Sequence, residues 1–276
     1  MNVLNSILNG LTSIVLAPFE GSPLLGLIIV SAVCGVLMTI VFRYTSNQQG
    51  IRAAADQTKA MMMRMRLFKD DFQVALGSQE QLLKATGKRL LYSFAPMLVL
   101  MVPFTLILVQ LAQWFEYRPL QTAETTVVEL RVSEPAWPTW QGATLEVPDG
   151  VVLETPGLRD EQNHTVSWRV RVTRPTDEPL RLRQGDVVVE KEFHGAATSD
   201  RIYALSPTRP GTNFWEQLLY PTETAFAAES PVEAISMHYP LRSTPIFGFD
   251  LPWWGTFLLL SMVAALLAKP FVKVQF

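Results

Sequence analysis

The sequence predicts an integral membrane protein with three transmembrane helices, a cytosolic helical hairpin and an extracytoplasmic all-β domain. Three observations predict this class: three long uncharged apolar runs, a basic polar segment between the first two runs, and a β-patterned polar segment between the last two. Charged residues form 17% of the 276-residue chain, below the roughly 25% of an average soluble domain. This composition argues against an ordinary soluble protein.

The three apolar runs cover residues 21–42, 90–115 and 251–268. A helix needs about 20 apolar residues to cross ~30 Å of hydrocarbon, so each run is long enough for one transmembrane helix. Two prolines inside the second run are expected to kink its helix rather than end it. Aromatic residues at the end of the second run and the start of the third suit one membrane interface: Trp114, Tyr117, Trp253 and Trp254.

The basic residues predict the orientation in the membrane. Residues 43–89 hold nine basic and four acidic residues, a net charge of +5, whereas residues 116–250 hold twelve basic and twenty acidic residues, a net of −8. Because cytoplasmic loops are enriched in Lys and Arg, residues 43–89 and the tail 269–276 are predicted to be cytosolic. The N-terminus and residues 116–250 are then predicted to lie outside.

Residues 1–20 have apolar side chains at helical spacing, which predicts a helix lying in the outer membrane interface before the first span. The alternative for this segment is a frayed terminus. A cleaved signal peptide competes with the first transmembrane span, but the sequence lacks a basic start. Val33 precedes Cys34, where a lipoprotein signal would have a smaller residue.

The cytosolic segment 43–89 predicts two helices folded back on each other as a coiled coil. Residues 50–73 are good helix formers, Gly77 and Ser78 are the expected break, and residues 79–89 return to the membrane. The first helix holds a cluster of flexible thioethers and guanidinium groups, which suits contact with varied apolar substrates. Its members are Met61, Met62, Met63, Arg64, Met65 and Arg66. The alternative is that the methionines only pack between the two helices.

Residues 116–210 alternate between apolar and polar side chains in short segments bounded by turns. Strands are predicted at 125–132, 165–172, 180–183 and 187–192, with turns at 148–150 and 184–186. About seven short strands at this spacing predict an antiparallel sandwich of immunoglobulin-like type. Residues 211–250 differ, with an amphipathic helix over 213–220 expected on the outer membrane surface, followed by a proline-rich extended segment.

The sequence shows no motif for enzymatic chemistry, and we expect neither catalysis nor a cofactor. Nucleotide-binding, hydrolase and metalloprotease motifs are absent. One cysteine and three well-separated histidines give no metal-ligand spacing, and a net charge of −2 does not favour nucleic acid. His194 with Ser199 and Ser206 is a weak candidate for a catalytic set. Glu190, Glu192 and Asp200 are most simply a solvated strand face.

Five polar side chains inside or near the first two spans are candidates for lining a hydrophilic groove: Ser31, Thr39, Ser93, Thr105 and Gln110. Hydroxyl groups in membrane helices most often bond to their own backbone or join helices, which is the alternative interpretation. A partly hydrated groove would lower the cost of moving a short polar tail across hydrocarbon, because each unpaired polar group there costs several kcal/mol.

This layout resembles the Oxa/YidC/Alb superfamily of membrane insertases, in particular the branch that includes the insertase subunit of the ER membrane complex. The shared core is three membrane helices with the N-terminus outside and a basic cytosolic helical hairpin between the first two. Here it corresponds to residues 21–42, the Met-Arg hairpin, and residues 90–112 and 251–268. Unlike many bacterial members, this chain has no arginine in its first span, and its β domain lies between the second and third spans.

The resemblance implies an insertase-like protein that assists apolar segments of client membrane proteins in passing from the cytosol into the bilayer. The hairpin would make first contact with the client, and the groove would pass its polar end. The alternative is a non-catalytic scaffold or adaptor subunit whose β domain binds an exoplasmic partner, with other membrane subunits packed on its spans. We expect a bacterial inner membrane as the location.

The predicted orientation is testable by cysteine labelling. A cysteine at Gly77 should resist an impermeant thiol reagent in right-side-out vesicles, and one at Asp149 should react, because inversion would move nine basic residues across the membrane. Inversion would also forfeit about 1 kcal/mol of lipid attraction per basic residue near the surface. Cys34 lies within a span and should stay silent. Labelling at Gly77 without labelling at Asp149 would reverse the topology.

Overall fold

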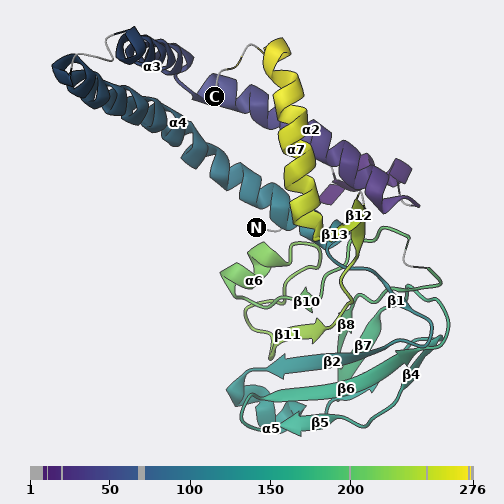
Figure 1. The fold of residues 1–276 in the computed structure, drawn as a ribbon. Coiled ribbons are helices and arrows are strands. Elements are labelled where there is room, and N and C mark those ends of the chain that lie inside the picture. The colour runs from purple at the N-terminus through teal and green to yellow at the C-terminus, as the bar shows by residue number, and fades with distance from the viewer. Residues whose placement is uncertain are drawn as a thin grey trace. The chain divides into compact units, whose positions relative to one another are not determined.

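The structure is a computed structural model of the chain, and it describes residues 9–10, 12–19, 21–67, 72–198, 200–246, 248–272 and 274. The chain forms two compact units. The β-containing unit comprises residues 1–27 and 107–256, and the helical unit comprises residues 28–106 and 257–276. Three long helices have residues in both units (Figure 1): α2 (Pro23–Thr45), α4 (Phe72–Phe115) and α7 (Trp253–Val272).

Three helical segments are long and apolar enough to cross a membrane, namely Pro23–Thr45, Pro96–Phe115 and Trp253–Val272. They fall on the three apolar runs of the sequence, so the prediction of three membrane helices is confirmed at this level. Pro96 and Pro103 lie inside α4 without ending it. The protein is therefore an integral membrane protein.

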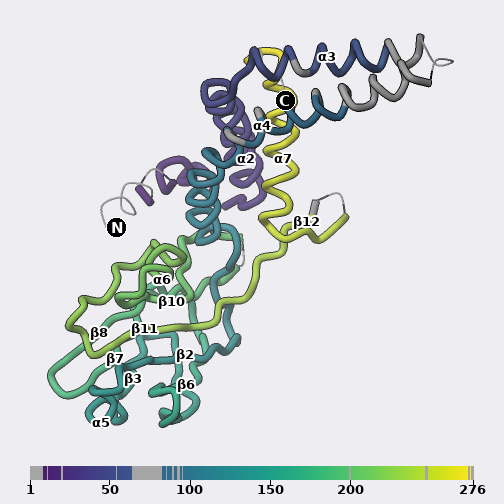
Figure 2. The backbone as a smooth tube through the Cα atoms, turned by 90° about the vertical axis from the view of Figure 1, so that its left-hand side faces the viewer, coloured from purple at the N-terminus to yellow at the C-terminus, as the bar shows by residue number. Residues whose placement is uncertain are grey.

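The polar helical hairpin consists of α3 (Gln48–Leu67) and the first half of α4, which run alongside each other (Figure 2). Asn47 caps α3, since its Oδ1 accepts a hydrogen bond of 2.9 Å from the Gly50 N–H. The predicted break at Gly77 and Ser78 is wrong, because both residues lie within α4. A Gly costs about 1 kcal/mol in a helix interior, which the strong helix formers around it offset. The connection falls on residues 68–71, outside the described residues.

Within the helical unit, α2 and α7 pack closely through a glycine. A Cβ at Gly35 would overlap the backbone carbonyl oxygen of Ser261 and lie 3.1 Å from the Cβ of Ala264. Small residues permit such close approach between membrane helices. Helix α4 contacts α7 through the rings of Phe104 and Phe257, whose centroids are 6.0 Å apart.

The described part of the N-terminal segment is helical at Asn9–Gly10 and Thr12–Leu16 and ends in the 3₁₀ helix η1 (Ala17–Phe19). It packs against the first turn of α2: a Cβ at Gly26 would lie 3.3 Å from the Cβ of Phe19 and 3.5 Å from a methyl of Leu16. Helical structure thus occurs where the sequence predicted it in the described part of residues 1–20, and its place in the outer membrane interface stays a prediction. Residues 1–8, 11 and 20 lie outside the described residues.

The main sheet of the β-containing unit has the strand order β10-β11-β2-β6-β4, with β5 also paired to β6. All of these pairs are antiparallel. The strand bounds are β2 Thr125–Val132, β4 Val151–Leu153, β5 Leu158–Asp160, β6 Thr165–Val172, β10 Thr208–Arg209 and β11 Val232–Met237. The predicted strands at 125–132 and 165–172 match β2 and β6 residue for residue.

A second, three-stranded sheet has the order β3-β7-β8, formed by β3 (Thr144–Glu146), β7 (Leu180–Gln184) and β8 (Val187–Lys191). Strands β7 and β8 form a hairpin that pairs Gln184 with Val187, and Gly185 in its turn has φ +57°. Inward side chains of both sheets share one hydrophobic core. They include Val128, Leu130, Leu145, Val166, Trp168, Val170, Leu180 and Leu182. The immunoglobulin-like connectivity stays a prediction.

Short elements complete the described part of the unit. Strands β1 (Leu120–Gln121) and β9 (Gly195–Ala196) pair in parallel, and β12 (Thr244–Ile246) pairs with β13 (Phe249–Leu251) just before α7. The helical turns are η2 (Glu134–Ala136), α5 (Trp137–Trp140) and α6 (Phe214–Leu219). The predicted helix over 213–220 is confirmed as α6, with Asn213 as its N-cap.

The contact between α2 and α7 predicts how the protein responds to a single methyl group. Gly35→Ala should destabilise the protein by about 1–3 kcal/mol, because the new methyl collides with backbone rather than with a movable side chain. Gly87→Ala in α4 is the matched control, since a Cβ there meets nothing within 4 Å. Thermal unfolding in detergent measures both. If the Gly35→Ala and Gly87→Ala variants had the same melting temperature, the close packing of α2 and α7 would be contradicted.

Candidate functional site

The Met-Arg cluster predicted to contact substrate lies in the second half of α3. Met62 and Met63 are exposed, at 52% and 71%, and Met61 is half-buried. Adjacent helical residues point about 100° apart, so the two exposed thioethers face different sides of the helix. Both thioethers are therefore accessible, as contact with a substrate would require, and that contact stays a prediction. The side chains of Arg64, Met65 and Arg66 lie outside the described residues.

Two of the predicted groove residues lie in α2, on the face that holds the close glycine contact. Ser31, Gly35 and Thr39 follow at intervals of four residues and share one face of the helix. Ser31 is 0% exposed and Thr39 is 2% exposed. The Thr39 hydroxyl donates a 2.8 Å hydrogen bond to the carbonyl oxygen of Gly35. These side chains are enclosed, and neither borders open space in the described structure.

The other three predicted groove residues lie in α4. Among the described side chains, no contact shown by the structure joins these residues to α2. The exposed Thr105 donates to the Met101 carbonyl oxygen at 2.8 Å. The Ser93 side chain lies outside the described residues. Gln110 is 4% exposed and belongs to the β-containing unit. The shared groove stays a prediction.

Gln110 belongs to a polar junction that the sequence did not reveal. Its Nε2 donates to Oδ1 of Asn9, and Asn9 Nδ2 donates at 3.0 Å to the Pro221 carbonyl oxygen. One turn further along α4, Gln113 Nε2 donates at 3.0 Å to the Leu219 carbonyl oxygen. The last turns of α4 are thereby joined to the N-terminal helix and to the end of α6. The sequence signal that could have indicated this junction is the pair of glutamines three residues apart in an apolar run.

Helix α6 presents an apolar face beside this junction. Phe214, Trp215 and Leu219 are exposed, and the rings of Phe214 and Trp215 meet edge to face with centroids 5.4 Å apart. Glu216, on the inner side of the helix, forms an ion pair with Arg131 of β2 at 2.6 Å. The helix is thus held to the sheet by a charge pair while its aromatic rings remain uncovered. Contact of these rings with the outer membrane surface stays a prediction.

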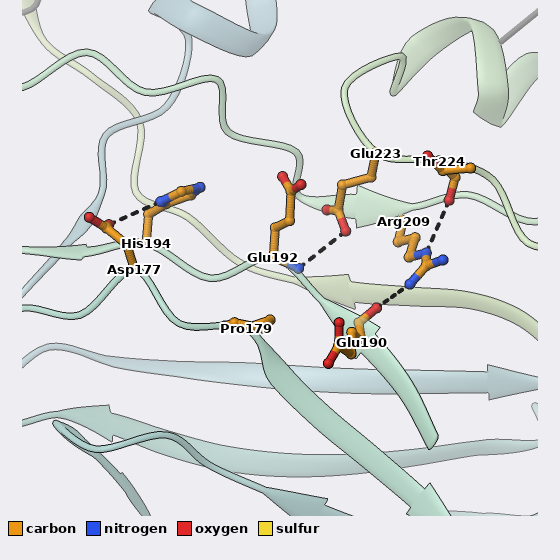
Figure 3. Close-up of a pocket in the computed structure, with 8 residues that line it drawn as sticks. All are labelled: Asp177, Pro179, Glu190, Glu192, His194, Arg209, Glu223 and Thr224. Carbon is orange, nitrogen blue, oxygen red and sulfur yellow. Dashed lines mark hydrogen bonds and ion pairs between the residues drawn. The ribbon is translucent and has the colours of Figure 1, made fainter. Parts of the chain in front are cut away.

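A polar pocket of about 470 Å³ lies beside β8 in the β-containing unit. Figure 3 shows His194 and Asp177 at one end of it, Arg209 and Thr224 at the other, and Glu192 between them. The Nδ1 of His194 lies 3.1 Å from Asp177 Oδ1. Arg209 donates to the backbone carbonyls of Thr224, at 3.0 Å, and Glu190.

A buried ion pair lies beside this pocket. Lys191 Nζ contacts Glu223 Oε1, and it also donates at 2.7 Å to the Ser206 carbonyl oxygen. The two charged side chains are 0% and 3% exposed. Burial lowers the pKa of Lys191 and raises the pKa of Glu223, while their mutual attraction opposes both shifts. Glu223 Oε2 also accepts from the Glu192 N–H at 3.2 Å.

These contacts revise the sequence interpretation of this region. Glu190 and Glu192 were expected on a solvated strand face, and both are exposed; in addition they border a pocket. Lys191 was not singled out, although the alternation of β8 places it on the inner face. The Ser206 hydroxyl donates to the Thr208 carbonyl oxygen at 2.7 Å, and this is the bond that the structure shows for it. Ser199 lies outside the described residues.

The pocket beside β8 is bordered by several carboxylates. Among the described residues, no group of three or more His, Cys, Asp or Glu side chains is arranged to hold a metal ion. The carboxylates of Asp177, Glu190 and Glu192 are exposed around the pocket, where they can accept hydrogen bonds from a cationic group. No protein-family model, curated protein or solved structure matches this chain.

The buried pair predicts that removing its lysine destabilises the protein more than removing the arginine of an exposed pair. Lys191→Met leaves Glu223 buried without its counter-charge and should destabilise the protein by about 3–5 kcal/mol. Arg181→Met removes one partner of the exposed pair with Glu190, 3.0 Å long, and should cost at most about 1 kcal/mol. Denaturant unfolding followed by tryptophan fluorescence, to which the buried Trp168 contributes, measures both.

A double variant separates the charge from the packing. Lys191→Met combined with Glu223→Gln should recover part of the lost stability, because no uncompensated carboxylate remains. Equal midpoints for Lys191→Met and Arg181→Met would show that the buried pair adds nothing beyond a surface pair.

Proposed function

We propose that this protein is an insertase-like membrane protein, which guides apolar segments of client proteins from the cytosol into the bilayer. The proposal rests on the resemblance of its layout to the Oxa/YidC/Alb superfamily and on one structural observation. That observation is the continuity of α4, a single helix of 44 residues that leads from the polar hairpin into the second membrane span.

An uncovered apolar stripe follows α4 where it passes from the hairpin into the span. We call it the α4 stripe, and its members are Leu90, Leu91, Phe94, Met97, Leu98, Met101 and Val102, each more than half exposed. They recur at intervals of three and four residues, so they form one continuous face. The contact of Phe104 with Phe257 on α7 comes only after the stripe ends.

The stripe and the hairpin supply two successive contacts for a client. Met62 and Met63 are flexible, exposed thioethers that adapt to side chains of different shape. The stripe then offers an apolar surface along which a client helix can pack while it leaves water. Lipid covers this surface when no client is present, so exchange of lipid for client needs no rearrangement of the core. The groove of polar side chains is not required for this route.

The charge distribution supports an N-out orientation for this route. The hairpin segment, net +5, would lie in the cytosol, where clients are made, and the acidic segment 116–250 would lie outside. The β domain would then be an extracytoplasmic, immunoglobulin-like sandwich on a bacterial inner membrane. In this orientation α6 lies at the outer interface.

Photo-crosslinking tests whether clients follow the stripe. A photoreactive residue in place of Leu98 should crosslink to a short-tailed membrane client during insertion, because a client helix packs on that face. The matched control replaces Leu267 of α7, which is 68% exposed but lies off the stripe. Equal client crosslinking at both positions would show only contact within the bilayer and would contradict the route.

Reconstitution tests the activity itself. Proteoliposomes should insert the same client several-fold faster than empty vesicles, and Met62→Gln with Met63→Gln should remove most of the gain by making the first contact polar. The paired change of Leu158→Gln and Val187→Gln, exposed in the β domain, is the control. Insertion no faster than in empty vesicles would reject the proposed function.

The polar pocket beside β8 favours a second candidate, a scaffold subunit whose β domain binds an exoplasmic partner. Its exposed carboxylates, Asp177, Glu190 and Glu192, suit a basic partner segment. Affinity purification in mild detergent distinguishes the two functions. A stable stoichiometric complex that a Glu192→Gln variant loses favours the scaffold, whereas transient crosslinks to nascent chains favour the insertase.

A further inference from the structure

Helix α6 has a fixed inner side and an uncovered apolar side. Glu216 holds the inner side to β2 through its ion pair with Arg131 at 2.6 Å. Trp215 and Leu219, four residues apart, share the uncovered side, and the ring of Phe214 packs edge to face against that of Trp215. These three apolar side chains are between 49% and 67% exposed, and we call them the α6 patch.

The α6 patch lies at the level where the second membrane span ends. The carbonyl oxygen of Leu219 accepts a 3.0 Å hydrogen bond from Gln113, which lies in the last turn of both α4 and the span that ends at Phe115. Figure 1 shows α6 at the end of the β-containing unit that holds the last turns of α4, with α5 at the opposite end. A helix bonded to the last turn of a membrane span lies where hydrocarbon meets water.

The N-terminal helix fixes the end of α6 a second time. Asn9 donates at 3.0 Å to the carbonyl oxygen of Pro221, just after α6, and it accepts a hydrogen bond from Gln110 of α4. Ile14 and Val15 of this N-terminal helix are exposed as well. The two elements bonded to α6 are therefore a membrane span and a second helix with uncovered apolar side chains.

The order of the helices places the α6 patch on the membrane side opposite to the polar hairpin. Helix α4 leads from the hairpin through the membrane and ends at Phe115, so α7 begins on this far side at Trp253. Trp254, in the first turn of α7, is 53% exposed, and tryptophan is enriched at membrane interfaces. This assignment does not depend on which side of the membrane is cytosolic.

The composition of α6 selects the part of the lipid that it contacts. Glu216 is the one charged residue of α6, and its carboxylate is paired with Arg131. The sequence of residues 9–19 contains no charged residue. Without a lysine or arginine in either segment, attraction to anionic headgroups contributes little, and burial of Trp, Phe and Leu in the headgroup–acyl boundary supplies the binding.

We propose that the α6 patch inserts into the membrane leaflet opposite to the hairpin and holds the β-containing unit against the bilayer. Its partner is the acyl-chain region of that leaflet, whatever the charge of the headgroups. The contact is independent of the proposed insertase-like function, because no residue of the α6 patch belongs to the hairpin or to the α4 stripe.

Spin labelling measures the depth of the α6 patch. The full-length protein, with Cys34 replaced by alanine, carries a nitroxide at Leu219→Cys in phosphatidylcholine vesicles. Collisions with oxygen, which concentrates in hydrocarbon, and with a water-soluble nickel chelate should place this label about 5–10 Å below the headgroups. The matched control is Leu158→Cys, since Leu158 is 74% exposed in β5 of the same unit and should collide freely with the chelate. Adding phosphatidylglycerol should leave both depths unchanged.

A charged variant tests whether apolar burial holds the helix in the bilayer. Trp215→Asp should lower the ratio of oxygen to nickel collisions at the Leu219→Cys label several-fold, because a carboxylate resists burial in hydrocarbon. Val187→Asp, at an exposed position of β8, should leave the ratio unchanged. Both variants should keep the melting temperature of the parent in detergent, since neither side chain is packed in the structure.

Four results would overturn the proposal. The first is a Leu219→Cys label that collides with the chelate as freely as the Leu158→Cys label. The second is a label shielded from both reagents or broadened by the label of another copy, which would show that protein covers the α6 patch. The third is insertion only when phosphatidylglycerol is present. The fourth is an unchanged collision ratio in the Trp215→Asp variant.

Discussion

Backbone N–H and C=O groups cannot remain unpaired in hydrocarbon, and this constraint determines how the chain is built. It requires each membrane crossing to be helical, and α4 extends that helix far beyond the bilayer, from Phe72 to Phe115. A helix of 44 residues is about 66 Å long, roughly twice the ~30 Å of hydrocarbon. The part outside the membrane is rich in strong helix formers such as Gln, Leu and Lys, which favour the same helical conformation. A cytosolic contact surface and a membrane surface thereby become one continuous face.

The same constraint explains why polar side chains along the spans differ in their hydrogen-bond partners. The hydroxyls of Thr39 and Thr105 donate to carbonyls one turn earlier in their own helices, so they need no partner elsewhere. The amides of Gln110 and Gln113 have more hydrogen-bonding groups than their own helix can satisfy, and they bind other segments of the β-containing unit. Gln110 and Gln113, near the end of α4, therefore join elements, whereas the hydroxyls of Thr39 and Thr105 bond within their own helices.

Much of the fold could be predicted from the sequence because its signals are local. Alternation placed β2 and β6 at their observed residues, and apolar runs located the spans. The break at Gly77 was misplaced, since a glycine among strong helix formers costs too little to end a helix. The candidate sites were less predictable, because they depend on contacts between distant residues. Lys191 meets Glu223 across 32 positions, and Asn9 meets Gln110 across 101. A single sequence contains no pattern for such pairings.

The junction at the end of α4 has a consequence for biogenesis. The side-chain amides of Gln110 and Gln113 can make their hydrogen bonds only when Asn9 and the backbone around Leu219 are present. During synthesis, α4 emerges more than a hundred residues before Leu219, so Gln113 cannot make its bond to the Leu219 carbonyl oxygen until α6 has been made. The first two spans can enter the bilayer early, while the final depth of the second is fixed late. Translation past α6 is therefore required before the last turns of α4 can make all of these bonds.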